Sequence, residues 1–153
     1  INRIPIDIRD LAQEVIQELS PLAIGRNLDL QLIIEKQELN YQISIDRLIL
    51  KRVLVNLIGN SLKFTETGHI LLNITGSSMN NPMIKILVQD TGIGISSEDK
   101  AHLFERFRRG SHKRSNSGLG LYLCRRIVEK HNGTIQVESQ LNQGTTFTIL
   151  LPI

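Results

Sequence analysis

Hydrophobic residues recur every three or four positions in two segments of the chain, which predicts two amphipathic helices. Asp7 precedes the first segment and is placed to cap its helix, and we expect Pro21 to kink or end that helix. Asp46 precedes the second segment, which runs through Phe64 before Thr67-Gly68 breaks the pattern. Each segment predicts a helix that buries one face.

Alternating apolar and polar residues predict the strands of a sheet. The predicted strands cover residues 28–34, 69–76, 83–90, 134–140 and 145–151. Between them, a short helix is expected to end within Leu103–Phe107, and residues 110–117 have the composition of a surface loop. Gly120–His131 predicts a further helix, which ends at Asn132-Gly133.

The order of these elements along the chain predicts a single α/β domain over residues 1–153. We expect a two-layer sandwich with a mixed, mostly antiparallel sheet. About three helices would cover one face, and water would cover the other. Gln136 and Glu138 alternate with Ile135 and Val137, as this arrangement requires.

Composition narrows the possible functions only slightly. The net charge of +3 is mild, and no pattern of basic and aromatic residues favours nucleic-acid binding. No apolar run approaches the length of a membrane span, and no signal peptide opens the sequence. We therefore expect a cytoplasmic domain, whether or not its parent protein is membrane-anchored. Cys124 is the single cysteine, and we expect a buried structural thiol.

Asp90 ends the third predicted strand and is followed by Gly92 and Gly94. Counting by twos from Ile84 places its carboxylate on the helix-covered face, where it needs a hydrogen-bond donor. The 6-amino group of adenine is such a donor. An aspartate that merely initiates a turn before glycine is an equally good interpretation of this segment alone.

Asn56, Asn60 and Lys63 lie at spacings that place them on one face of the second helix. A solvated polar face is the usual meaning of such spacing, but these residues are interleaved with apolar ones. An amide oxygen is a suitable ligand for Mg²⁺, which takes few protein ligands together with phosphate oxygens and water.

Gly118-Leu119-Gly120-Leu121 opens the helix after the basic loop. The free N–H groups and the dipole at such a helix start favour a bound phosphate, although ordinary helices also begin with glycine. The preceding loop contains several cations, most of which are compatible with a plain charged surface.

These segments, in this order, resemble the ATP-binding domain of bacterial sensor histidine kinases, a Bergerat-type fold shared with gyrase, Hsp90 and MutL. The resemblance also includes Gly144–Phe147, which matches the closing motif of that family, and it spans nearly the whole chain. It implies ATP and Mg²⁺ as cofactors, with Asp90 on adenine and Asn60 on the metal. The implied nucleotide-binding residues are Asn56, Asn60, Lys63, Phe64, Asp90, Gly92, Gly94, Ile95, Leu103, Arg109, Gly118, Leu119, Gly120, Leu121 and Thr146.

The resemblance also assigns Lys63 and Arg109 to the phosphates, and Phe104 and Phe107 to an aromatic cluster that packs the lid over the site. Two positions depart from the family pattern. Arg108 stands where an aromatic residue is common, and Asn116-Ser117 stands where the family has Gly-Thr.

Asn56 decides between branches of this superfamily. The hydrolytic and serine-kinase branches have a glutamate there, which acts as a general base, and a neutral amide cannot take that role. Histidine kinases do not need the base, because neutral imidazole is already nucleophilic. Asn56, Lys63 and Arg109 are then the expected catalytic residues, which position the γ-phosphate and neutralise its charge together with Mg²⁺.

The expected reaction is transfer of the γ-phosphoryl group of ATP to a histidine, and then to an aspartate of a response-regulator receiver domain. The chain contains His69, His102, His112 and His131, and none of them lies in a recognisable phosphoacceptor helix. The acceptor is therefore expected on a separate dimerisation domain. We expect this chain to bind ATP as a monomer without phosphorylating itself, and the full-length protein to be a homodimer.

Three alternatives remain open from the sequence. The first is a stand-alone ATPase or an anti-sigma-type serine kinase, which Asn56 disfavours. The second is a scaffold that no longer uses nucleotide, which the retained Asp90 and Asn60 disfavour. The third is a nucleic-acid binder, which is disfavoured because the basic residues cluster in one loop.

Overall fold

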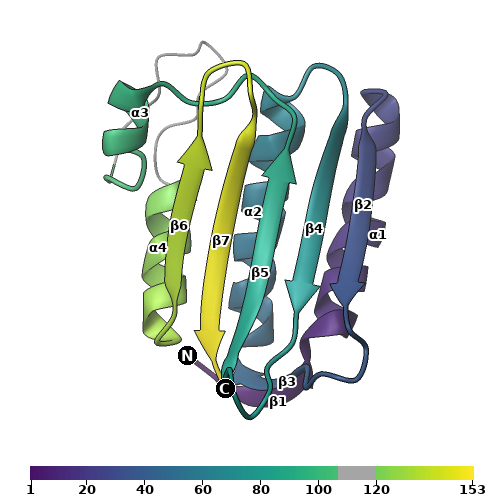
Figure 1. Ribbon diagram of the computed structural model, residues 1–153, viewed down its shortest axis with the longest axis vertical. Helices are drawn as coiled ribbons and strands as arrows, with labels where there is room; N and C mark the ends of the chain where they lie inside the picture. Colours follow the sequence, from purple (N-terminus) through teal and green to yellow (C-terminus); the bar gives the residue numbers. More distant parts are fainter. Residues whose placement is uncertain (107–119) are drawn as a thin grey trace.

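The computed structural model describes residues 1–106 and 120–153 and has the two predicted layers (Figure 1). Its five-stranded sheet has the order β2-β4-β5-β7-β6. Only β2 and β4 are parallel, and the other neighbouring strands are antiparallel. The strands are β2 (Asp29–Glu35), β4 (His69–Thr75), β5 (Met83–Asp90), β6 (Thr134–Ser139) and β7 (Thr145–Pro152).

Three helices pack behind one face of this sheet, as expected (Figure 1). They are α1 (Ile8–Gly25), α2 (Arg47–Phe64) and α4 (Gly120–Lys130). The core lies between the two layers, where alternate residues of the central strands, such as Ile86 and Ile149, are fully buried. The central helix α2 buries seven residues there. No described helix is long and apolar enough to cross a bilayer.

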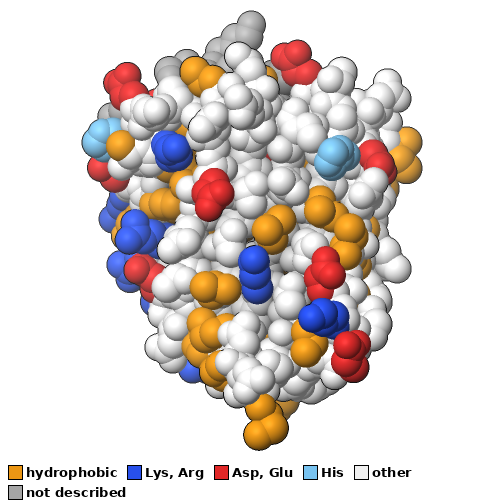
Figure 2. Space-filling model, viewed as in Figure 1, with side chains coloured by type: hydrophobic (Ala, Val, Ile, Leu, Met, Phe, Trp, Pro, Cys, Tyr) orange, Lys and Arg blue, Asp and Glu red, His pale blue; other side chains and the backbone are white. Residues whose placement is uncertain are grey.

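The opposite face of the sheet is open, and Figure 2 shows it directly. Acidic, basic and apolar side chains are intermixed on this face. Its central strands contribute half-buried leucines, Leu71 and Leu87, which alternate with buried residues of the core. Charges of both signs on this face give no support for a nucleic-acid surface.

Pro21 does not end the first helix, contrary to one of the two expected outcomes. α1 continues through it to Gly25, because Ala23 in the following turn is buried in the core. The hydroxyl of Ser20 donates to the carbonyl of Ile16 at 2.6 Å and adds a bond within the turn that precedes the proline. Tertiary packing therefore offsets the helix bond that proline removes.

Three further elements, two short strands and one short helix, differ from the sequence prediction. β1 (Ile4–Asp7) and β3 (Gln42–Ile45) form a small antiparallel sheet that was not predicted, because four residues give too short an alternation. The short helix α3 (Ser97–Ala101) ends before Leu103–Phe107, where we expected its end. Ser96 caps its start by accepting from the N–H of Asp99 at 3.1 Å, and the N–H of His102 donates to the carbonyls of Asp99 and Lys100 at its end.

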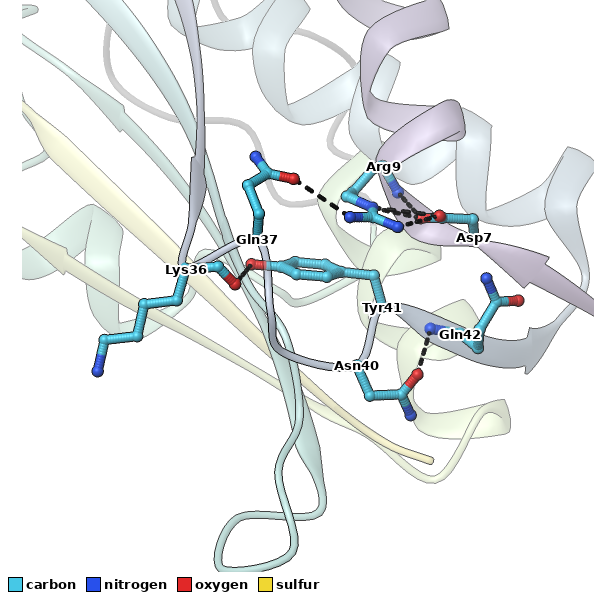
Figure 3. Close-up of polar contacts among 7 residues, drawn as sticks. All are labelled: Asp7, Arg9, Lys36, Gln37, Asn40, Tyr41 and Gln42. Carbon is cyan, nitrogen blue, oxygen red and sulfur yellow. Dashed lines mark hydrogen bonds and ion pairs between the residues drawn. The ribbon is translucent and has the colours of Figure 1, made fainter.

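A partly buried polar cluster joins β1, α1 and the segment between β2 and β3 (Figure 3). Arg9 pairs with Asp7 at 2.6 Å, and its guanidinium lies 4.8 Å from the ring centre of Tyr41. The hydroxyl of Tyr41 donates to the carbonyl of Glu35 at the end of β2. This end of the sheet lies opposite Asp90, since Glu35 pairs with Thr75 and Asp90 with Ile70 at the two ends of β4.

His131 has a structural role at the end of α4. Its ring is 4% exposed. Nε2 accepts from the backbone N–H of Asp46 at 3.0 Å, and Nδ1 lies 2.9 Å from the carbonyl of Ile127. These two contacts define a neutral ring that donates from Nδ1, and they tie the end of α4 to the start of α2.

Glu14 on α1 is expected to make the free energy of unfolding depend on pH in the acidic range. It contacts Arg47 and Lys51 of α2 at 3.1 and 3.0 Å, and these cations lower its pKa from 4.5 to about 2. The stabilisation is therefore complete above the unfolded-state pKa and is lost as the pH falls from 4.5 to about 2. Urea unfolding at several pH values should show Glu14→Gln less stable than wild type at pH 7 and equal to it near pH 2.

Glu66→Gln is the matched control, because this exposed residue belongs to no ion pair of the described chain. A Glu14→Gln difference that stays constant across the pH range would contradict the role of the two cations.

Candidate functional site

Asp90 lies at the end of β5, and its carboxylate points into the helix-covered layer, as predicted. It is 7% exposed. Its Oδ1 atom accepts from the backbone N–H of Gly92 at 2.9 Å and from that of Thr145 at 3.1 Å. Both bonds go to the same oxygen, and neither uses Oδ2. The carboxylate is thus fixed in orientation, with a second acceptor not engaged by these bonds.

Burial raises the pKa of Asp90, while the Gly92 N–H, the Ser61 side chain and the Thr145 N–H oppose this shift. None of the described ion pairs involves Asp90. An ionised carboxylate in such surroundings gains from a ligand that brings a further donor. The amino group of a purine is a donor of the required kind.

The residues Gly92–Ile95, here called the glycine loop, pass between the end of α2 and the β6–β7 connection. The N–H of Ile93 donates to the carbonyl of Phe64 at 3.1 Å, and the carbonyl of Ile93 accepts from Asn142 at 2.7 Å. Gly94 has φ 73°, and a Cβ there would lie 1.9 Å from the carbonyl oxygen of Gln140. The loop is therefore bonded to the protein on both sides.

Glycine at position 92 has a similar structural reason. A Cβ on Gly92 would lie 2.5 Å from the carbonyl oxygen of Phe64 and 2.8 Å from Oγ1 of Thr65. The sequence suggested that Gly92 and Gly94 let a ligand approach, whereas these contacts are to the protein's own atoms. Thr65 Oγ1 is buried and has no hydrogen-bond partner within the described chain, so it is a polar atom beside Asp90 that a ligand or water can satisfy.

The polar face of α2 lies next to the start of α4. Asn60 Nδ2 donates to Asn56 Oδ1 at 3.5 Å, which shows that the two amides share a face. A Cβ on Gly120 would lie 2.7 Å from Nδ2 of Asn56, so glycine lets the first turn of α4 pack on this amide. Lys63 follows in the last turn of α2 and is half-buried. Asn56, Asn60 and Gly120 thus lie together.

The bond between the two amides uses the Nδ2 donor of Asn60 and not its carbonyl oxygen. The described residues contain no group of three or more His, Cys, Asp or Glu side chains able to hold a metal. A divalent cation at this site could take an amide oxygen such as that of Asn60 and complete its shell with ligand oxygens and water. Mg²⁺ bound with a nucleotide has this preference.

The turns after α3 pack against β7, the strand whose residue Thr145 donates a hydrogen bond to Asp90. Leu103 and Phe104 are half-buried against the core. The rings of Phe104 and Phe147 meet edge to face, with centres 6.3 Å apart, and Arg125 of α4 lies 5.7 Å from the centre of the Phe104 ring. Phe104 therefore has a partner in β7. Phe107, the other residue expected in this aromatic cluster, lies outside the described residues.

Several predicted site residues lie outside the described part of the chain, namely Phe107, Arg108, Arg109, Asn116, Ser117, Gly118 and Leu119. Leu121, in the first turn of α4, is half-buried and packs on the core. Thr146 follows Thr145 in β7 and is half-buried. Neighbouring residues of a strand face opposite sides, so Thr146 lies on the open face while Thr145 bonds to Asp90.

Ser61, Thr65 and Ser139 are polar residues around the site that the sequence interpretation missed, and Thr145 entered it only as part of the closing motif Gly144–Phe147. The first two are on or directly after α2, and Thr145 and Ser139 pair across the β6–β7 hairpin. Periodicity contained a signal for Thr145, because it shares a face with buried Phe147. Ser61 lies one position after Asn60 and was obscured by the surrounding apolar residues.

Cys124 on α4 is expected to be unreactive in the folded protein. It is 2% exposed, its Sγ lies 3.9 Å from the carbonyl of Val53, and burial raises its pKa to about 12. Compared with a free cysteine, the thiolate fraction at pH 8 should fall by roughly three orders of magnitude. A disulfide reagent should therefore label the native chain very slowly and the urea-unfolded chain rapidly. Equal rates in the two states would contradict the buried thiol.

Comparison with known proteins supports the expected family. The family model for histidine kinase-, DNA gyrase B- and HSP90-like ATPases matches residues 45–153. The signal transduction histidine-protein kinase BarA of Escherichia coli (strain K12) is 35% identical over 153 residues, which cover 96% of this chain and 17% of BarA. The chain thus spans about a sixth of the length of this relative.

Solved structures agree with this result. The nucleotide-free catalytic domain of histidine kinase ThkA is 26% identical, with a TM-score of 0.85, over 99% of this chain and 98% of that one. Full-length ShkA in complex with AMPPNP is 30% identical, with a TM-score of 0.85, over 99% of this chain and 31% of that one. ThkA has also been solved in complex with the response regulator TrrA, where the likeness, at 24% identity, concerns the fold.

Proposed function

Since the chain belongs to the histidine kinase-, DNA gyrase B- and HSP90-like ATPase family, in its sensor histidine kinase branch, we propose that it binds Mg-ATP and donates the γ-phosphoryl group to a histidine on a separate dimerisation domain. The observation that carries this proposal is the buried carboxylate of Asp90. It is oriented by two backbone donors on one oxygen, and it lies beside a buried hydroxyl without a partner.

In this proposal Asp90 accepts from the 6-amino group of adenine. Two features support this role. Burial disfavours the ionised carboxylate in the free protein, and an amino donor offsets that cost. The glycine loop lies beside the carboxylate, since a Cβ on Gly92 would lie 2.9 Å from Oδ1 of Asp90, and Leu103 is proposed to contact the base on the basis of the family resemblance.

The phosphate end of the nucleotide would lie near Asn56, Asn60 and Lys63, beside the start of α4. The contact between Gly120 and Asn56 supports this placement, because a helix start supplies backbone donors to an anion. Bound Mg²⁺ would neutralise charge on the phosphates, and Asn60 is its proposed protein ligand. Arg109, Gly118 and Leu119 are proposed to complete the phosphate site on the basis of the family resemblance.

Asn56 favours transfer to histidine over hydrolysis. A neutral amide cannot remove a proton from water, whereas a neutral imidazole attacks without a base. We therefore propose that the chain positions ATP and leaves the nucleophile to its partner domain. The proposed onward acceptor is an aspartate of a response-regulator receiver domain. The parent protein is proposed to be a homodimer and this chain a monomer.

The proposal is tested by incubating the chain with Mg-ATP labelled at the γ-phosphate and a purified dimerisation domain of a relative such as BarA. We expect label on the histidine-bearing domain in an acid-labile, alkali-stable form, and none on this chain alone. Asp90→Asn is the negative control. Steady release of ADP and phosphate without the partner would instead support a stand-alone ATPase.

A further inference from the structure

The hydroxyl of Ser139, at the end of β6, lies where three segments meet. It accepts from the backbone N–H of Ile95 in the glycine loop at 2.8 Å. It lies 2.9 Å from the carbonyl of Gly144, in the β6–β7 connection, and 2.9 Å from Oγ1 of Thr145, at the start of β7. Ser139 is 9% exposed, so little solvent is available to replace these contacts.

The proton positions of this cluster follow from the donors available. A serine hydroxyl has one proton, which goes to the carbonyl of Gly144 because that oxygen can only accept. The proton between the two hydroxyls therefore comes from Thr145. Ser139 then accepts two hydrogen bonds and donates one, which satisfies its oxygen fully and fixes its orientation.

Ser139 also connects the two ends of the glycine loop. Thr145 donates its hydroxyl to Ser139 and its backbone N–H to Asp90, which lies two residues before the loop. Ile95, at the other end of the loop, donates to Ser139. Within the described chain, Ser139 supplies the one side-chain hydrogen bond between the glycine loop and strands β6 and β7.

The contact extends to the start of α3. Ser96, which caps α3, directly follows Ile95, and the ammonium of Lys100 on α3 donates to the carbonyl of Ser139 at 3.1 Å. Leu103 follows two residues after this helix. Ser139 thus holds the side of the site where the base is proposed to bind.

We propose that Ser139 is a positioning residue for the nucleotide: its hydroxyl holds the glycine loop and the start of α3 at the distance from Asp90 that the base requires. It does not touch the nucleotide itself. This inference rests on the proposed function, since it concerns the same site. Without the hydroxyl, the Ile95 N–H loses its partner, and the loop samples positions that do not fit the base.

The test compares Ser139→Ala with Ser77→Ala. Ser77 is also buried, at 1% exposure, and its hydroxyl donates to the carbonyl of Asn40 at 3.4 Å, in the segments beyond β2 and β4 and away from Asp90. Calorimetry should show that Ser139→Ala raises the Kd for Mg-ATP about tenfold, as expected for losing the one hydrogen bond by which Ser139 holds the glycine loop. ADP should show the same fold-change, because the base is common to both. Ser77→Ala should leave both Kd values within twofold.

Amide hydrogen exchange separates positioning from a general loss of stability. In Ser139→Ala without nucleotide, exchange at Ile95 should accelerate at least about tenfold, while core amides of β5 exchange as in wild type. Ser139→Cys keeps the volume and a weaker acceptor, so its Kd should lie between those of wild type and Ser139→Ala. This variant also provides the comparison if Ser139→Ala does not fold.

The outcomes are distinguishable from failure of the proposed function. A wild-type chain that binds no ATP would overturn the proposed function and this inference together. Wild-type binding with an unchanged Kd in Ser139→Ala would overturn this inference alone. A Kd increase that Ser77→Ala reproduces would also overturn it, because a remote buried serine would then have the same effect.

Discussion

Asp90→Asn is expected to reduce ATP affinity by at least about a hundredfold without destabilising the fold. The Oδ1 atom of asparagine can still accept from the N–H groups of Gly92 and Thr145. Its Nδ2 group, however, is a donor, and in the proposed complex it would face the amino donor of adenine. Two donors in contact with no acceptor between them oppose binding of this base.

The same substitution should leave the stability of the fold unchanged or raise it, although it lowers the affinity for ATP. Burial raises the pKa of Asp90 in the folded state, so the native chain loses stability as the pH rises through that pKa. Asp90→Asn removes this loss, and its unfolding temperature at pH 7 should equal or exceed that of wild type. Thermal unfolding at pH 7 checks this result directly, and a marked decrease would contradict the account of the carboxylate.

The same substitution should change base preference. Inosine triphosphate has an oxygen acceptor where ATP has the amino donor, so Asp90→Asn should bind ITP more tightly than ATP. Asp29→Asn, an exposed carboxylate at the start of β2, is the matched control and should keep the preference for ATP. ATP affinity of Asp90→Asn within twofold of wild type would show that Asp90 does not recognise the base.

Asn60→Ala is expected to remove the effect of Mg²⁺ on ATP binding and to slow phosphoryl transfer by at least about a hundredfold. The side chain of Asn60 is proposed to bind the metal that neutralises the phosphates. Affinity for ATP in the presence of EDTA should stay close to that of wild type, because Asp90 and the glycine loop are unchanged. Paired titrations with Mg²⁺ and with EDTA measure this difference.

Asn73→Ala is the control for this experiment. Asn73 lies on β4, and its side chain donates to Glu35 at 2.9 Å, on the opposite face of the sheet from α2. It should leave the Mg²⁺ dependence intact. If Asn60→Ala retains that dependence as well, the metal ligand lies elsewhere in the chain.

The sequence predicted the elements with strong local signals. The second helix was predicted with the bounds that the structure shows, because Asp46 caps it and the pattern breaks at Thr67-Gly68. β5 was also predicted at its observed bounds. The two-layer architecture follows from these elements, since each has one apolar face that must be covered.

Elements that depend on distant contacts were not predicted. β1 and β3 are stable because they pair with each other and because Tyr41 lies buried beside them, and none of this is visible in four-residue segments. The continuation of α1 through Pro21 depends on the burial of Ala23. Such tertiary contacts override local propensity.

In the candidate site, too, features that follow from local sequence periods were predicted, and features that depend on distant contacts were not. The face shared by Asn56 and Asn60 and the inward direction of Asp90 followed from helix and strand periods. The partners of Asp90 did not, because Gly92 and Thr145 reach it through a turn and a neighbouring strand. The need for glycine at position 94 comes from the backbone of Gln140, which is far away in the sequence.

The central claim is that this chain contains a nucleotide site built around Asp90, and a calorimetric titration with ATP, with and without Mg²⁺, tests it most directly. The account predicts saturable binding to one site, tighter with Mg²⁺ than in EDTA, and lost in Asp90→Asn. An absence of binding by the wild-type chain in both conditions would contradict it, and so would equal binding by Asp90→Asn.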